Sequence, residues 1–200
     1  MRAWIFLISF LGIIGDLDMA HADKPLKAPT TEVAIFSGGC FWCVESAFDK
    51  LPGVISAVSG YTGGHSLNPT YELVTAENTG HKESVQVTFD PSKITYDELL
   101  ETYWHNIDPF DPAGQFCDKG DSYKAFIFYT NATQKKKAEE SKKKYEAQLK
   151  QPIVTEIEAA KIFYPAEEYH QKYYEKNPIR YKFYRYSCGR DARLDKVWGK

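Results

Sequence analysis

Short apolar runs separated by turn residues predict five strands, at 32–37, 54–59, 84–89, 126–129 and 154–157. The clearest is the third, in which Val85, Val87 and Phe89 alternate with polar residues. Successive side chains on a strand point to opposite faces, so this alternation is typical of a strand with one buried face.

Apolar residues at helical spacing predict four helices, at 40–50, 96–107, 132–150 and 167–176. The third contains the run KKKAEESKKKYEAQLK, which we interpret as a solvated helix face with Glu–Lys pairs. Residues after Ile179 lack such spacing and predict an irregular, aromatic-rich tail.

Strands and helices interleave without an internal repeat, which predicts a single α/β or α+β domain at 32–200, with its tail from about 179. Two long segments, 60–70 and 108–122, are rich in Gly, Pro, Asn and Asp. Loops of this length are more often functional than merely connecting.

The first residues follow the pattern of a secretory signal. Arg2 precedes an apolar run at 3–15, and Ala20-His21-Ala22 follows. The run is shorter than the ~20 residues that span a bilayer. We expect a signal peptide at 1–22, cleaved after Ala22, a flexible lead-in at 23–31, and an exported protein, periplasmic or secreted, with no membrane contact after cleavage. An uncleaved membrane anchor is the alternative.

Charge and cysteine content exclude several classes of protein. A formal net charge of −2 argues against a nucleic-acid binder that depends on a positive field. Four cysteines in 200 residues are too few for a disulfide scaffold. They are therefore structural singles, metal ligands or redox groups.

Cys40 follows a predicted strand and two glycines and opens a predicted helix. The partial positive charge of a helix start stabilises a thiolate, which predicts a lowered pKa and a nucleophilic sulfur. The glycines would let the backbone approach a ligand closely. Cys43 lies on the same helix face one turn away, so the two cysteines have the geometry of a dithiol redox pair.

Other interpretations of Cys40 and Cys43 are a buried small hydrophobe, a zinc site and a thioredoxin-like oxidoreductase. Zinc would need two more ligands at metal spacing, and Cys117 and Cys188 stand alone. The intervening Phe41 and Trp42 favour a fourth interpretation, because two aromatic rings beside a nucleophile suit a small apolar group such as a methyl.

The heptad GCFWCVE at 39–45 resembles the signature of the A-type peptide-methionine sulfoxide reductases. Further blocks match in order: SGYTGGH at 59–65, NPTY at 68–71, TGHKESVQVTFDP at 79–91, GQFCDKGDSY at 114–123 and AEEYHQKYYEKNP at 166–178. The resemblance covers about 33–198, nearly all of the chain beyond the predicted signal.

The resemblance implies reduction of the S epimer of methionine sulfoxide, free or in proteins, as repair after oxidation. It implies an α+β fold with a mixed sheet on a ferredoxin-like core, and no metal or organic cofactor. It also implies a thioredoxin-like dithiol as reductant. We expect a monomer that binds no nucleic acid.

A sulfoxide oxygen leaves only when it is protonated or hydrogen-bonded, so acid and hydroxyl groups are needed near the sulfur. The resemblance assigns the acid to Glu83 and the oxygen-binding hydroxyls to Tyr71 and Tyr123. It places Asp118 near the site, where it would orient water or substrate. Phe41 and Trp42 would pack around the sulfoxide methyl.

The implied reaction begins when Cys40 attacks the sulfoxide sulfur and becomes a sulfenic acid. A second thiol then forms a disulfide with Cys40, which an external dithiol reduces. Cys43 is our first candidate for this resolving thiol and Cys188 the second, which could act after Cys43 in a relay. We interpret Cys117 as a bystander. A non-enzymatic sulfoxide-binding module is a further alternative, disfavoured by the intact Cys40 and Glu83.

Overall fold

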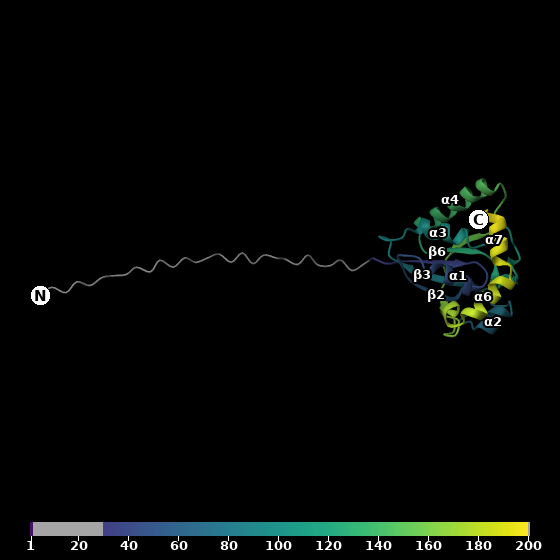
Figure 1. Ribbon diagram of the computed structural model, residues 1–200, viewed down its shortest axis with the longest axis horizontal. Helices are drawn as coiled ribbons and strands as arrows, with labels where there is room; N and C mark the ends of the chain where they lie inside the picture. Colours follow the sequence, from purple (N-terminus) through teal and green to yellow (C-terminus); the bar gives the residue numbers. More distant parts are fainter. Residues whose placement is uncertain (2–29, 200) are drawn as a thin grey trace.

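The computed structural model describes Met1 and residues 30–199 (Figure 1). The predicted signal peptide and lead-in therefore fall almost wholly outside the described residues. The strands are β1 Glu32–Ser37, β2 Val54–Thr62, β3 Lys82–Phe89, β4 Gly114–Gln115, β5 Asp118–Lys119, β6 Phe126–Tyr129, β7 Glu156–Ala159 and β8 Tyr164–Pro165. The helices are α1 Phe41–Phe48, α2 Tyr71–Thr75, α3 Tyr96–Trp104, α4 Ala132–Leu149, α5 Tyr173–Lys176, α6 Pro178–Ser187 and α7 Arg190–Trp198, with a 3₁₀ turn, η1, at Asp121–Tyr123.

Six strands form one sheet in the order β7-β6-β1-β3-β2-β8. All neighbours are antiparallel except β6 and β7, so the sheet is mixed. The succession β1-α1-β2-β3-α3-β6 with strand order β6-β1-β3-β2 is the ferredoxin-like arrangement. The expected α+β class and core are thereby confirmed.

The main core lies between the sheet and the helices α1 and α3. Strand alternation supplies one half of it, because Val85, Val87 and Phe89 all point to this face and are fully buried. Helix α3 starts at a capping box in which the Thr95 side chain and the Glu98 carboxylate each bond the other's backbone N–H. The opposite face of the sheet carries a smaller cluster around Phe128.

Helix α4 confirms the interpretation of its lysine run as a solvated face. Within it only Gln134, Ala138 and Tyr145 are buried. On its outer side, two Lys–Glu pairs at i,i+4 spacing each have a nitrogen-to-oxygen distance of 3.9 Å.

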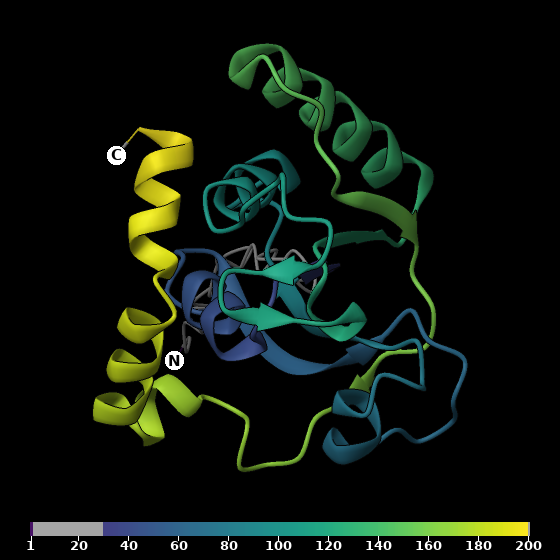
Figure 2. The ribbon, with the colours of Figure 1, turned by 90° about the vertical axis from the view of Figure 1, so that its right-hand side faces the viewer.

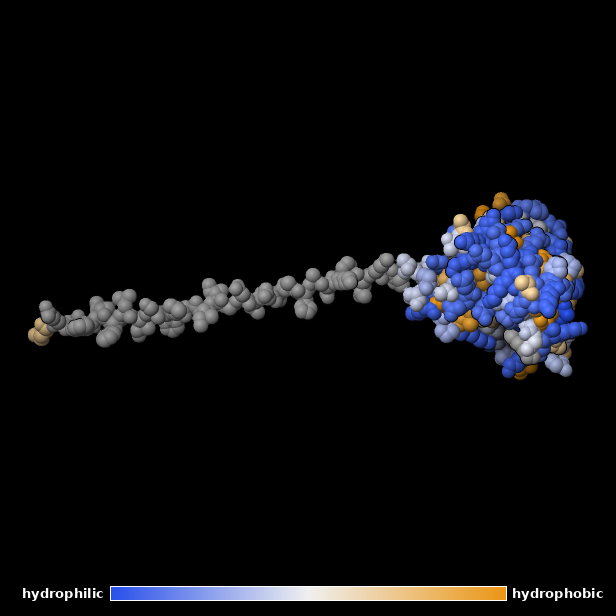
Figure 3. Space-filling model, turned by 90° about the horizontal axis from the view of Figure 1, so that it is seen from above, coloured by the Kyte–Doolittle hydropathy of each residue, from blue (hydrophilic) through white to orange (hydrophobic). Residues whose placement is uncertain are grey.

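The face seen in Figure 3 is mainly hydrophilic, with apolar residues scattered over it. Among the described helices, none combines the length and apolar character needed to cross a bilayer.

The C-terminal part differs from the prediction. The tail after Ile179 is not irregular but forms α6 and α7, which follow one another along one side of the molecule beside α1 (Figure 2). Of the helix predicted at 167–176, only the second half is helical, as α5. Its first half forms turns that end at Lys172, with φ +50°, where the backbone N–H is bonded by the buried Glu45 carboxylate at 2.9 Å.

Smaller differences concern the loops. The predicted loop at 60–70 begins with three residues of β2, and α2 follows it. The predicted loop at 108–122 contains the β4–β5 hairpin and η1. Strand β7 begins two residues later than predicted, because the Val154 amide bonds the Pro109 carbonyl instead of a strand partner.

Candidate active site

Cys40 lies at the start of α1, directly after β1 and two glycines. Gly39 has φ +78°, and a Cβ there would lie 2.6 Å from Cβ of Gln115. A Cβ on Gly38 would lie 2.8 Å from Cγ2 of Ile107. The glycines therefore admit side chains of the protein's own core. The close approach of a ligand to this backbone stays a prediction.

Glu83 reaches the same helix start from β3. It shares a strand face with Val85 and Val87, which places its carboxyl group on the side where α1 packs. Its Oε2 accepts the Phe41 backbone N–H at 2.9 Å, and the residue is 2% exposed. The predicted acid and Cys40 are thus brought together, separated along the helix start by one peptide group.

The pKa of Glu83 is raised from 4.5 to about 8, mainly by burial, and the charges of Asp118 and Cys43 act in the same direction. The hydrogen bond from Phe41 acts in the opposite direction, because it favours the carboxylate. A carboxyl group with this pKa is largely protonated at neutral pH. It can therefore donate a proton, as the role implied for Glu83 requires.

The side chains of Cys40 and Cys43 form a buried pair, 6% and 1% exposed, that share a hydrogen bond. Burial raises the pKa of the Cys40 thiol well above its usual value. The bond from Cys40 lowers the pKa of Cys43 to about 6, and the positive charges of Arg190 and Arg185 lower it too. In the absence of substrate the thiolate of this pair is favoured on Cys43.

The prediction that the helix start lowers the pKa of Cys40 is therefore wrong for this state. The first free N–H groups are directed at carboxylates: that of Phe41 at Glu83 and that of Cys40 itself at Asp118. The sulfur of Cys40 receives neither donor, and desolvation decides the direction of its shift. A thiolate arises on Cys40 only when its proton passes to Cys43.

Tyr71 and Tyr123 lie beside Glu83, and their hydroxyls interact with each other. Tyr71 opens α2 and Tyr123 ends η1. Glu77, just after α2, joins the two segments by accepting the backbone N–H of Ser122 at 3.0 Å and its hydroxyl at 2.6 Å. Burial raises the pKa of Tyr71 to about 12 and that of Tyr123 further, so both hydroxyls stay protonated.

Phe41 and Trp42 belong to an aromatic cluster. The Trp42 ring stacks on Tyr173 with centroids 3.7 Å apart, and its indole N–H donates to Nδ1 of His170 at 3.1 Å. The His170 ring lies 4.9 Å from Phe41 and 4.6 Å from Tyr71. Three of the four aromatic residues that the resemblance implies around the substrate are thus held together by one imidazole.

Asp118, the first residue of β5, also lies at the site. The Tyr184 hydroxyl donates to its Oδ2, and the Cys40 backbone N–H also bonds this carboxylate. Burial raises the pKa of Asp118. The same Tyr184 hydroxyl lies next to the Cys40 sulfur, and its ring meets that of Trp42 edge-on at 5.8 Å.

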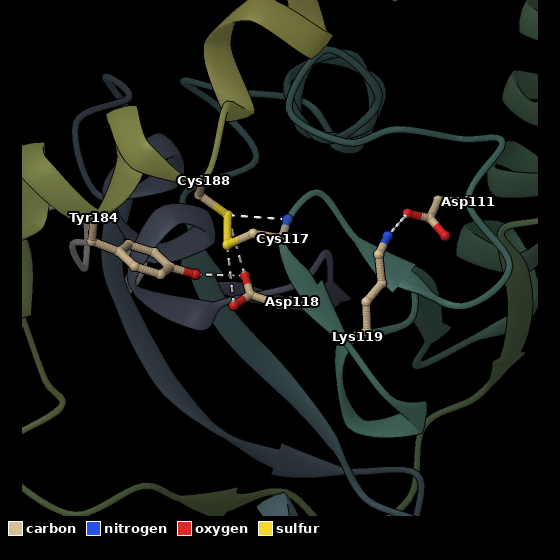
Figure 4. The surroundings of a disulfide bond; sticks show 6 residues. All are labelled: Asp111, Cys117, Asp118, Lys119, Tyr184 and Cys188. Carbon is tan, nitrogen blue, oxygen red and sulfur yellow. Dashed lines mark hydrogen bonds and ion pairs between the residues drawn. A yellow bond between two sulfur atoms is a disulfide. The ribbon is translucent and has the colours of Figure 1, made fainter.

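Cys117 and Cys188 are bonded to each other in a disulfide (Figure 4). Cys117, which we interpreted as a bystander, is thus bonded to the second candidate for the resolving thiol, and the interpretation of both cysteines as standing alone is wrong. The bond joins residues 71 positions apart and fastens the end of α6 to the β4–β5 turn. Its sulfurs lie 3.7 and 3.9 Å from the oxygens of Asp118. The sulfur of Cys188 is thus engaged in the bond to Cys117, while Cys43 is free.

Several residues at the site were not predicted from the sequence. His170 and Tyr173 hold Trp42, and Tyr184 joins Asp118 to Cys40. Glu167 accepts the Tyr61 hydroxyl at 2.8 Å and the Tyr71 backbone N–H at 2.9 Å. His170 and Glu167 occur in the AEEYHQKYYEKNP block, which was the available signal, whereas nothing in the sequence around Tyr184 distinguishes it from the other tyrosines.

Comparisons with known proteins agree with this geometry. A model of the peptide methionine sulfoxide reductase family matches residues 32–200. The chain is 54% identical over 175 residues to the peptide methionine sulfoxide reductase MsrA of Bacillus licheniformis, covering 86% of this chain and 97% of that protein. Its fold is similar to reduced Mxr1 from Saccharomyces cerevisiae (TM-score 0.71, 30% identity, 74% of this chain and 87% of that chain). It is also similar to methionine sulfoxide reductase A of Corynebacterium diphtheriae (TM-score 0.68, 32% identity, 76% and 77%).

Proposed function

The chain belongs to the peptide methionine sulfoxide reductase family, is a thiol-dependent oxidoreductase and reduces methionine sulfoxide; we propose that Cys40 and Glu83 carry out this reaction on the S epimer. The observation that supports the assignment is the Glu83 carboxyl group, held 2.9 Å from the Phe41 amide and largely protonated at neutral pH. It lies beside the nucleophilic sulfur without facing water.

In the proposed reaction the proton of Cys40 passes to Cys43, and the Cys40 thiolate attacks the sulfoxide sulfur. Glu83 donates its proton to the oxygen, and the hydroxyls of Tyr71 and Tyr123 bond that oxygen as charge develops on it. The oxygen passes to Cys40, which becomes a sulfenic acid, and methionine leaves.

Cys43 is the nearest candidate for the next step. Its thiol attacks the sulfenic sulfur of Cys40, a disulfide forms and water leaves. The pair is already in contact, so little movement is needed. Attack by Cys188 instead requires that its bond to Cys117 is first reduced.

We propose a thioredoxin-like dithiol as the external reductant, because a disulfide is regenerated most directly by dithiol exchange. Among the structural neighbours, yeast Mxr1 is described in complex with Trx2.

The test is an assay with resolved epimers. The purified protein with a dithiol reductant is expected to consume the S sulfoxide of free and peptide-bound methionine and to leave the R epimer. The same preparation is tested for insulin disulfide reduction. Activity on insulin without sulfoxide loss would instead identify a thioredoxin-like oxidoreductase, and binding of sulfoxide without turnover would identify a binding module.

We further propose that the protein is exported and works as a monomer. The support for export is the charged start, apolar run and Ala20-His21-Ala22 of the sequence. Fractionation of cells followed by sequencing of the protein's N-terminus is expected to recover a chain that begins at Asp23 outside the cytoplasm. Recovery of the full chain in membranes would support the anchor instead. Light scattering of the recovered protein measures its oligomeric state.

A further inference from the structure

We propose that the Cys117–Cys188 pair, once it is reduced, forms a binding site for Zn²⁺ together with the carboxylate of Asp118. Among the residues that the structure describes, these three side chains form a cluster whose ligand atoms all lie within 4.8 Å of one another (Figure 4). The proposal concerns only the reduced state of this pair, so it does not depend on the proposed function.

The three side chains supply donor atoms that Zn²⁺ prefers. Zinc sites in proteins are tetrahedral and use thiolate, imidazole and carboxylate ligands. Two thiolates and one carboxylate fill three positions, and water takes the fourth, as in other sites with three protein ligands. The sulfurs exclude Mg²⁺ and Ca²⁺, which take oxygen ligands, and the hard carboxylate favours Zn²⁺ over Cu⁺.

The distances between the sulfurs and the carboxylate already fit a tetrahedral site. Zn–S bonds of about 2.3 Å and Zn–O bonds of about 2.0 Å place the two ligand atoms about 3.5 Å apart. Sγ of Cys117 lies 3.7 Å from Oδ1 of Asp118, and Sγ of Cys188 lies 3.9 Å from Oδ2. After reduction the two sulfurs must separate to about 3.8 Å. Rotation about the Cα–Cβ bonds provides this separation, because the two Cα atoms are 4.9 Å apart.

The surroundings of the pair favour charged sulfur and a bound cation. The Cys117 backbone N–H is directed at Sγ of Cys188 at 3.2 Å, and a donor in this place stabilises a thiolate. Cys188 caps the C-terminus of α6, where the helix dipole favours a positive charge. The Tyr184 hydroxyl donates to Oδ2 of Asp118 and so orients this carboxylate, as hydrogen bonds orient the ligands of other metal sites.

The site is accessible, and the cations beside it have partners of their own. Cys117 is exposed, so an ion can enter from the solvent. The positive charges that act on Asp118 belong to Arg190 and Lys119. Lys119 is paired with Asp111, and the Arg190 guanidinium is bonded by two backbone carbonyls (Figure 4). Both cations are therefore already engaged.

Binding follows reduction and needs no further reactant. A dithiol reduces the Cys117–Cys188 bond to two thiols and is itself oxidised to a disulfide. Zn²⁺ then replaces the two thiol protons, which pass to the solvent, and coordinates both thiolates. The sulfur lone pairs are occupied by the ion, so the disulfide re-forms only after the ion is removed. Zinc thus protects this pair from oxidation.

The test is a metal titration of the full chain after reduction with a phosphine and removal of the reductant without air. Co²⁺, used as a spectroscopic probe, should give the absorption of a tetrahedral thiolate site, saturate at about one ion per chain and be displaced by Zn²⁺. Cys117→Ser should bind more than about 100-fold more weakly, because loss of a ligand exceeds the loss of a supporting hydrogen bond. Cys43→Ser is the matched control and should bind like the wild type.

Equal binding by the wild type and Cys117→Ser would overturn the proposal. Loss of binding in Cys43→Ser with retention in Cys117→Ser would overturn it too, since the ion would then lie at the buried pair. Circular dichroism checks that both variants are folded.

A second measurement needs no variant. The reduced wild type is oxidised with diamide, and formation of the Cys117–Cys188 bond is followed by peptide mapping. Zn²⁺ at ten times its Kd should slow this reaction about tenfold, because only the unbound fraction is oxidised, and a chelator should restore the rate. An unchanged rate with Zn²⁺ would contradict the proposal.

Discussion

The two cysteine pairs of this protein differ in almost every physical respect. Cys40 and Cys43 are three residues apart on one helix, buried, reduced and close to the buried carboxyl group of Glu83. Cys117 and Cys188 are 71 residues apart and lie at the surface, where their bond joins the β4–β5 turn to the end of α6. One pair has the surroundings that sulfoxide chemistry requires, and the other has the access that a protein reductant requires.

The difference indicates that the two demands are separated in space. Keeping Glu83 protonated at neutral pH needs a dry site, because desolvation is the main cause of its raised pKa. Burial of the Cys40–Cys43 pair also limits the access of a protein reductant, whereas the Cys117–Cys188 pair lies at the surface.

The largest expected effect comes from substituting one cysteine of each pair and comparing the two variants. Cys40→Ser should abolish methionine formation with any thiol reductant, because no sulfur remains to take the oxygen. Cys188→Ser should retain formation of about one equivalent in a single turnover, because Cys40, Cys43 and Glu83 are unchanged. Quenched-flow measurement of methionine tests both variants. Turnover by Cys40→Ser above background would remove Cys40 from its assigned role.

The next effect concerns the acid beside the buried pair. Glu83→Gln should slow the sulfoxide step by roughly 10²-fold or more, since a positioned acid contributes on this scale. Glu32→Gln, an exposed carboxylate on the neighbouring strand, is the control and should react like the wild type. Single-turnover rates at pH 7 decide. Equal rates for Glu83→Gln and Glu32→Gln would remove Glu83 from the mechanism.

The pH dependence of the sulfoxide step also tests Glu83 as the acid. The pKa of Glu83 is raised to about 8, so the proton it must donate is present below this value and lost above it. The rate of the sulfoxide step should therefore fall above pH 8, by about tenfold per unit once the carboxyl is ionised. Glu83→Gln should lack this decline. A rate that rises through pH 8 in the wild type would show that a thiol ionisation controls the step instead.

A second buried carboxyl anchors the helix of the interior pair and has a smaller effect, on stability. Burial raises the pKa of Glu45 from 4.5 to about 7. A raised pKa in the folded state means that the stabilising contribution is complete below 4.5 and is lost as pH rises through 7. The free energy of unfolding should decline over this window. Urea titrations of Glu45→Gln should show a flatter profile than those of Glu32→Gln.

The smallest effect compares the glycines next to each pair. Gly39→Ala should destabilise by about 1–2 kcal/mol through its positive φ and by about 1–3 kcal/mol more through overlap with Gln115. Gly189→Ala, with φ +68° and nothing within 4 Å, should show the first contribution alone. Thermal or urea unfolding measures both. Equal losses would mean that the Gln115 side chain moves away without penalty.

Local patterns allowed part of this arrangement to be predicted. The alternation at Val85, Val87 and Phe89 extends back to Glu83, which fixes the face on which that carboxyl lies. The spacing of Cys40 and Cys43 likewise fixes their contact once a helix forms. Both predictions need only the geometry of one element.

The remaining features depend on contacts between distant segments. The Cys117–Cys188 bond joins two loops whose proximity no local pattern encodes. Helices α6 and α7 were not predicted because they bury only Tyr181, Arg190 and Leu194, while the apolar side chains of Ile179, Phe183 and Tyr186 on α6 are exposed. Arg190 is 1% exposed, and its guanidinium is held by the carbonyls of Gly38 and Asn106 at 3.0 and 2.7 Å. The periodicity of apolar residues cannot predict that a charged side chain is buried.

Tyr184 and Cys188 lie one turn apart on α6, so they cannot move independently. The Tyr184 hydroxyl lies next to the Cys40 sulfur, and its ring contacts Trp42, while the surface pair is bonded. A Cys188 thiol that turns inward to reach Cys40 takes the end of α6 with it and displaces that ring. We therefore expect reduction of the Cys117–Cys188 bond, which frees the end of α6, to loosen the contacts of Tyr184 with Cys40 and Trp42.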